Sequence, residues 1–155
     1  MFVKNIVIVV IAVMWCFSVN AQSTEKGQSI CYEAQNIING LVDYTETSCL
    51  PSSGKKGALT FMFISSKPIF SVEASKKAWA IVTVAAIGKI LNDQPSIKTD
   101  EIWLSDINQV QNKVAYTLPT SLAKSLQKQV STEKINFEEM YSSINKNMIK
   151  KTVSK

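Results

Sequence analysis

The chain opens with an apolar segment, in which Lys4 is followed by an apolar run over residues 6–17. The run is followed by the pattern V-x-A at residues 19–21. A basic start, a short apolar run and such an ending are typical of a secretory signal peptide. An uncleaved anchor is the less favoured alternative, because spanning a bilayer needs roughly 20 apolar residues. We therefore expect residues 1–21 to be a cleavable signal peptide and residues 22–155 to be exported.

Apolar residues at helical spacing predict one helix near the start of the exported part. The pattern places Cys31 in the first turn and ends the helix near Asp43. Pro51 and the polar stretch PSSGKKG, residues 51–57, then predict a break in regular structure. The apolar positions of this helix are Ile30, Ala34, Ile37, Ile38, Leu41 and Val42.

A strand and a long helix are predicted next. Residues 58–65 are apolar on both faces, so we expect this strand to be buried on both. Ser71 is the expected N-cap of a helix that runs to Asp93. Between Ala78 and Ile87 this helix is nearly apolar all round, and ten residues are too few to span a membrane. We expect it to be buried against a sheet.

Two further segments, 99–106 and 112–119, alternate between apolar and polar residues, as half-buried strands do. The linker between them contains Asn108, and with Asp106 before it we expect a hairpin connection. Together with strand 58–65 and the helix after it, these segments predict a β-α-β-β unit. One plausible order puts segment 112–119 between the other two strands, but the sequence leaves the strand order open.

Two amphipathic helices are predicted near the C-terminus. The first follows Pro119 and carries a narrow apolar stripe. The second begins at Asn136, and Glu139 three residues later is typical of a capping box. Its strong stripe is either a core-facing surface or a partner-binding face. The candidate partner-binding residues are Phe137, Met140, Tyr141, Ile144 and Met148.

Cys31 and Cys49 are the cysteines that remain after residue 21. In an oxidising compartment we expect them to form a disulfide. A redox or metal role is less favoured, because the spacing is not C-x-x-C and two thiolates supply half a zinc site. The fold class predicted is a small single α+β domain with a stapled N-terminal helix, a β-α-β-β unit in a small mixed sheet, two C-terminal helices and a basic tail.

The composition excludes several chemistries. The chain has a net charge of +5 and contains no histidine and no arginine. Without imidazole there is no neutral-pH proton shuttle and no Ser-His or Cys-His nucleophile pair. Without guanidinium there is no bidentate fork for phosphate or guanine, and lysines without interleaved aromatics in the tail are a weak nucleic-acid signal. We expect no nucleic-acid partner, no metal and no cofactor.

Cys31, Gly40, Asp43, Cys49 and Pro51 form the pattern C-x8-G-x2-D-x5-C-x-P, and LNDQP follows at residues 91–95. This arrangement resembles small periplasmic immunity proteins that neutralise toxins of type VI secretion systems. The resemblance covers about a fifth of the exported chain. It implies an all-helical fold and an inhibitory role, whereas the alternating segments predict a mixed fold.

Some motifs resemble catalytic ones. Ser121 and Lys124 form an S-x-x-K motif at a helix start, as in penicillin-binding proteins, but the S-D-N and K-T-G companions are missing. The S-x-x-K spacing also recurs elsewhere, because serine and lysine are abundant. A glycine-containing turn at residues 52–57 lacks the spacing of a phosphate-binding loop. The carboxylates that could form an acid and base pair are Asp43, Asp100, Glu101 and Asp106.

These observations favour an exported, non-catalytic protein of a bacterial periplasm or secreted fraction that binds another exported or envelope protein. We expect no transmembrane span after cleavage, and the sequence does not predict the oligomeric state. One alternative is an immunity-type inhibitor of a secreted toxin. A second alternative is a small hydrolase that uses a Ser-Lys pair or two carboxylates.

Overall fold

The structure, a computed structural model, describes residues 25–152. The expected signal peptide lies outside these residues. The helices are α2 (Glu25–Leu41), α3 (Glu73–Asp93), α4 (Ile107–Gln111), α5 (Thr120–Ser131) and α6 (Phe137–Asn147), with 3-10 turns at Lys55–Gly57 and Ile69–Ser71. The strands are β1 (Thr47–Ser53), β2 (Leu59–Ser65), β3 (Thr99–Asp106), β4 (Val114–Pro119) and β5 (Ile149–Thr152).

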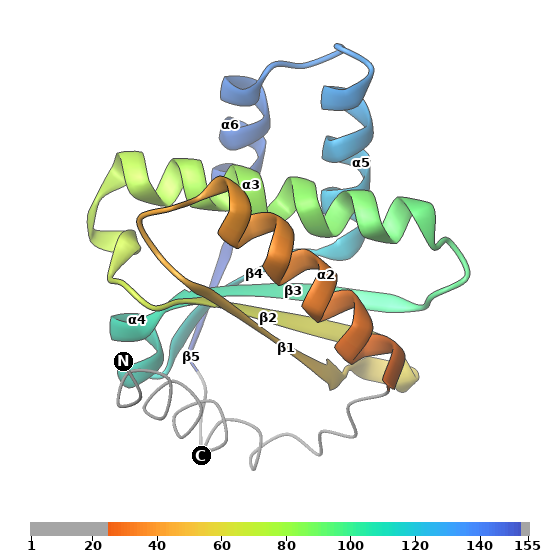
Figure 1. The fold of residues 1–155 in the computed structure, drawn as a ribbon, viewed down its shortest axis with the longest axis horizontal. Coiled ribbons are helices and arrows are strands. Elements are labelled where there is room, and N and C mark those ends of the chain that lie inside the picture. Colours follow the sequence, from red (N-terminus) through yellow and green to blue (C-terminus); the bar gives the residue numbers. More distant parts are fainter. Residues whose placement is uncertain (1–24, 153–155) are drawn as a thin grey trace.

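One five-stranded sheet organises the protein, with its strands in the order β1-β2-β3-β4-β5 (Figure 1). Neighbouring strands are antiparallel except β2 and β3, which are parallel. Parallel neighbours require a crossover, and α3 provides it. The sheet is therefore mixed.

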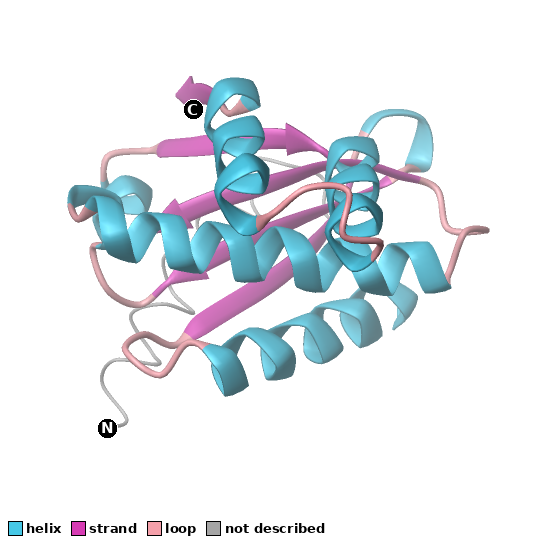
Figure 2. Ribbon diagram, turned by 90° about the horizontal axis from the view of Figure 1, so that it is seen from above, coloured by secondary structure: helices cyan, strands magenta, loops and turns pink. Residues whose placement is uncertain are grey.

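The long helices lie on the same face of the sheet (Figure 2). Trp79 of α3 is fully buried and its indole N–H donates to the hydroxyl of Thr47 in β1, at 2.8 Å. The core fills the space between the helices and the sheet. Its largest strand side chains are Phe61 and Phe63 of β2, Ile102 and Leu104 of β3 and Leu118 of β4.

The predicted α+β class is confirmed, and a disulfide joins Cys31 of α2 to Cys49 of β1. The predicted strand at 58–65, the helix ending at Asp93 and the two C-terminal helices are also present. None of the helices between Glu25 and Thr152 combines the length and apolarity needed to cross a membrane.

The break expected at residues 51–57 is wrong over its first part, because β1 continues to Ser53. Pro51 misled the prediction, since proline lacks the N–H that a central strand needs. β1 is an edge strand, in which the backbone N–H groups of alternate residues point away from β2. The N–H groups of Thr47 and Cys49 point away from β2, and the backbone nitrogen of Pro51 lies two positions further along on the same side. A proline costs no ladder hydrogen bond there.

The strand order suggested for the β-α-β-β unit is not the one observed. β4 does not lie between β2 and β3 but pairs with β3 on the outer side. Residues 149–152 of the basic tail form β5 beside β4. Lys150 and Lys151 are thus part of a strand. Sequence patterning misses β5 because it has four residues and little apolar alternation.

Two local expectations differ in detail. Ser71 is not the N-cap of α3; Val72 occupies that position without a side-chain cap. The linker at 107–111 is the short helix α4. Asp106 caps α4 by accepting a hydrogen bond from the Gln109 N–H, at 2.9 Å. This buried carboxylate also accepts from the Phe70 N–H, at 2.8 Å, so it ties the 3-10 turn at Ile69–Ser71 and the start of α4 to the end of β3.

α3 is buried on one side only. Val84, Ile87 and Leu91 are in the core, whereas Ile81 and Val82 on the outer side are partly exposed. The helix is therefore apolar all round for two different reasons. One face covers the sheet, and the other forms part of an open surface.

The mixed sheet contradicts the all-helical fold that the resemblance to immunity proteins implies. The cysteine, glycine and proline spacing that carries the resemblance instead belongs to a helix joined to an edge strand.

Candidate functional site

α2 is joined to β1 by more than the disulfide. Both cysteines are buried. Gln35 accepts a hydrogen bond from the Cys49 N–H, at 2.9 Å. Asn39 accepts from the Thr47 N–H at 2.7 Å and donates to the Thr47 carbonyl at 3.2 Å. These side chains occupy backbone groups that an unpaired edge strand would offer to another strand. The disulfide therefore holds α2 in a position in which the helix blocks the β1 edge of the sheet.

The candidate partner-binding face of α6 is divided by the structure. Met140 and Ile144 are fully buried, and Tyr141 is nearly so. Met148 is partly buried and packs against the core. Phe137 alone of the five is prominent at the surface, with 59% of its area exposed. A partner could reach Met140, Tyr141 and Ile144 only by unpacking the core.

Phe137 borders a groove of about 660 Å³ that crosses the outer face of α3. Leu41 at the end of α2 borders it as well and is 70% exposed. The surface that these residues expose in the groove is almost entirely apolar. The other lining residues are Ile37 of α2; Ala74, Lys77, Ala78, Ile81, Val82, Ala85, Ala86 and Lys89 of α3; and Gln127, Val130 and Ser131 of α5.

The elements that form the groove are fixed by close packing. α3 and α5 meet at Gly88, where a Cβ would come within 2.4 Å of the Ala123 carbonyl oxygen. Asn92 of α3 donates to the Lys124 carbonyl at 3.0 Å and to the Gln127 side chain at 2.7 Å. α2 is anchored through the disulfide to the sheet. The groove is therefore bordered by helices that are held in place independently of any ligand.

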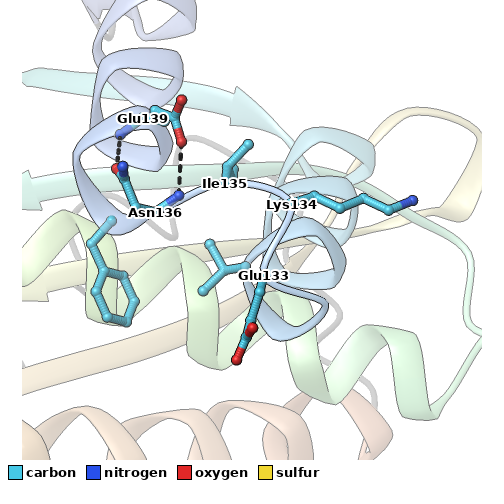
Figure 3. A pocket seen from close by; sticks show the side chains of 7 residues that line it. Glu133, Lys134, Ile135, Asn136 and Glu139 are labelled. Atoms are coloured by element: carbon cyan, nitrogen blue, oxygen red, sulfur yellow. Dashed lines mark hydrogen bonds between the residues drawn. The ribbon is translucent and has the colours of Figure 1, made fainter.

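A second hollow of about 480 Å³ lies at the turn between α5 and α6 (Figure 3). It adjoins the groove, with which it shares the lining residues Val130 and Phe137. Asn136 and Glu139 form the predicted capping box there, with both reciprocal hydrogen bonds at 2.9 Å. The capping box sets the start of α6 and hence the position of Phe137. The hollow is also lined by Glu133, Lys134 and Ile135.

A polar cluster lies where α3 and α6 begin to pack. The Tyr141 hydroxyl donates to Glu73 at 2.5 Å, and Lys76 pairs with the same carboxylate at 3.0 Å. The hydrogen bond from Tyr141 and then that from Lys76 lower the pKa of Glu73. Burial, followed by the hydrogen bond to Glu73, raises the pKa of Tyr141. Lys77 of the groove forms an ion pair with Glu138 beside this cluster.

The face of the sheet opposite the long helices carries a different cluster. Lys151 of β5 pairs with both carboxylate oxygens of Glu101, each at 2.9 Å. Its ammonium lies 5.3 Å from the centre of the Trp103 ring, and the Trp103 indole donates to Glu101 at 3.1 Å. The cluster joins β5 to β3 across β4, so these groups are engaged with one another.

The catalytic candidates are dispersed. Ser121 is exposed on α5, and neither it nor Lys124 lines the groove or the hollow. Asp106 caps α4 and Glu101 pairs with Lys151, so these two carboxylates have structural partners. Asp43 and Asp100 also do not line either cavity. Within residues 25–152, no three His, Cys, Asp or Glu side chains gather as metal ligands.

Comparison with models of protein families, with curated proteins and with solved structures finds no match.

Sequence reasoning found Phe137 but missed Leu41 and the outer face of α3. The signal was present, because residues 78–87 are apolar on every side and the sheet can cover only one. An apolar face left over on a helix that already packs on a sheet must meet either another element or a surface.

Proposed function

We propose that this protein is an exported, non-catalytic protein-binding domain of a bacterial envelope or secreted fraction, and that the groove over α3 is its binding site. The observation that carries the proposal is the groove itself, with Leu41 and Phe137 exposed at its borders. Large apolar side chains gathered around a concave surface are typical of interaction sites. The groove offers no converging set of polar groups for a reaction.

Export is supported by two independent features. The N-terminal pattern is that of a signal peptide. The buried disulfide between Cys31 and Cys49 is a bond that persists in oxidising compartments and is rare in the cytosol. The proposed partner is accordingly another exported or envelope protein. The immunity-type role loses its support, because the fold implied by that resemblance is not the fold of the chain.

The proposal is tested with the full-length gene, tagged after Lys155 and expressed in its own source. Protein recovered from envelope and culture fractions is used for affinity capture, and retained proteins are identified by mass spectrometry. The N-terminus of the recovered protein is determined from the same material, and we expect it to be Gln22 because residues 1–21 are the expected signal peptide. We expect one stoichiometric partner that is retained at high salt, since apolar contacts are not screened.

Groove variants make this test specific. Leu41→Ser and Phe137→Ser remove exposed apolar surface with little effect on the core. Tyr32→Ser is the matched control, because Tyr32 is 69% exposed on α2 and does not line the groove. We expect the Tyr32→Ser control to retain the partner and the double variant Leu41→Ser with Phe137→Ser to lose it. Equal retention of the partner by the wild type, the control and the double variant would contradict the proposal.

A further inference from the structure

The floor of the groove has the dimensions and the residues of a helix-packing surface. Along α3 it extends from Ala74 to Lys89, which is about 22 Å at the usual rise per residue. Alanines at four floor positions keep side-chain volume low, so a second helix could approach closely. The larger Ile81 and Val82 lie at mid-length. The four alanines are Ala74, Ala78, Ala85 and Ala86.

The charged residues that line the groove are two lysines. Lys77 and Lys89 are twelve positions apart on α3, a separation of about 18 Å along the helix axis. Lys89 therefore lies at one end of the groove, and Lys77 lies within one helical turn of the other end. Long lysine side chains place their methylene stems against apolar surface and their ammonium groups at the rim. A ligand in the groove meets a positive charge near each end.

Both lysines have partners in this structure that can be exchanged. Lys77 pairs with Glu138, and Lys89 pairs with Asp93 at 2.8 Å. The carboxylate of Glu33 also attracts the Lys89 ammonium electrostatically. The Glu138 and Asp93 side chains are 73% and 64% exposed. Exposed ion pairs contribute little to stability, so carboxylates brought by a ligand can replace or join them at small cost.

We infer that the groove binds an amphipathic helix of the partner protein, whose apolar stripe is flanked by acidic residues about twelve positions apart. This inference rests on the proposed function and specifies the chemistry of its partner. The stripe packs on the alanine floor between Leu41 and Phe137. The two acidic residues pair with Lys77 and Lys89. A fatty acid fits less well, because it has one anionic end and the groove has a cation near each end.

The test uses two designed peptides of 18 residues labelled with fluorescein. They share one stripe of leucine and alanine at helical spacing. One peptide carries glutamates at two flanking positions twelve residues apart, and the other carries lysines there. The protein is expressed from its full-length gene and purified after processing by its host. Binding of each peptide to it is followed by fluorescence anisotropy at low and high salt. We expect the acidic peptide to bind about tenfold more tightly at low salt, a preference that salt reduces.

Protein variants then locate the effect. Lys77→Gln combined with Lys89→Gln should abolish the preference for the acidic peptide. Lys98→Gln combined with Lys146→Gln removes the same charge from exposed positions outside the groove and should keep the preference. Thermal unfolding of each variant confirms that it is folded.

The failures are distinguishable. If both peptides bind equally and Leu41→Ser weakens both, the acidic flanks are wrong and the proposed groove function stands. If neither peptide binds while the captured partner still depends on Leu41 and Phe137, the partner segment is not a helix of this kind. If cis-parinaric acid binds and Phe137→Ser abolishes its binding while neither peptide binds, the groove is a lipid site and the inference is overturned.

Discussion

Gly88 of α3 faces the backbone of Ala123 in α5, and a Cβ at Gly88 would lie 2.4 Å from the Ala123 carbonyl oxygen. No side chain can be accommodated at this distance without moving one helix. Glycine is otherwise unfavourable in a helix, so its presence at this position reflects the close approach of α5 and not a helical preference.

Gly88→Ala should therefore destabilise the protein. Overpacking of this kind costs about 1–3 kcal/mol. Gly40→Ala in α2 is the control, because a Cβ there meets no atom within 4 Å and alanine favours a helix by roughly 0.5–1 kcal/mol. Urea unfolding of both variants measures the difference. Equal stability of Gly88→Ala and wild type would mean that α3 and α5 lie further apart than the 2.4 Å approach requires.

Thr47→Val should leave the indole N–H of Trp79 without its partner. Trp79 is fully buried and donates to Thr47 at 2.8 Å. An unsatisfied buried donor costs about 1–3 kcal/mol, and valine preserves the shape of threonine. In a Trp79→Phe background the same change should cost less, because no donor remains. A double-mutant cycle by chemical unfolding gives the coupling, and additive effects would contradict the hydrogen bond.

Loss of the disulfide should lower stability without detaching α2. Replacing Cys31 and Cys49 by serine should cost about 3 kcal/mol, because the bond closes a short loop with a sequence separation of 18. The contacts of Gln35 and Asn39 with β1 remain, so circular dichroism should keep its native shape. Unfolding of the wild type with and without reductant checks this. If reductant leaves wild-type stability unchanged, the bond is not formed in the purified protein.

The carboxylate of Glu73 should contribute to stability above pH 4.5 and lose that contribution in acid. Its pKa in the folded protein is below its ordinary value of 4.5, because Tyr141 and Lys76 bond to the ionised form. The unfolded chain therefore takes up the proton first as pH falls, and stability decreases until the pH is below the folded pKa. The stability difference between wild type and Glu73→Gln should shrink over that range.

Tyr141→Phe is the second variant for this pH dependence. It removes the hydroxyl that bonds to Glu73, so the decrease in stability at low pH that is due to Glu73 should become smaller. Thermal unfolding between pH 3 and 7 compares the three proteins. An acid limb that is the same in all three would show that another group controls it.

The order of secondary-structure elements could largely be predicted from the sequence. Hydrophobic periodicity located α5 and α6, the long apolar run after Ser71 located α3, and the alternation of apolar residues located β3 and β4. These signals are local, because each depends on neighbours within one element. The disulfide could be predicted by counting, since only Cys31 and Cys49 remain after the apolar segment at residues 6–17.

The sheet order and the groove depended on the tertiary structure. β5 became a strand because β4 had an unpaired edge, and Pro51 was tolerated in β1 because that position faces away from β2. Periodicity shows that a face is apolar but not what covers it. Met140 and Ile144 proved to be core residues, whereas Leu41 and Phe137 stayed exposed. That division is decided by contacts between segments far apart in the chain, which no local pattern encodes.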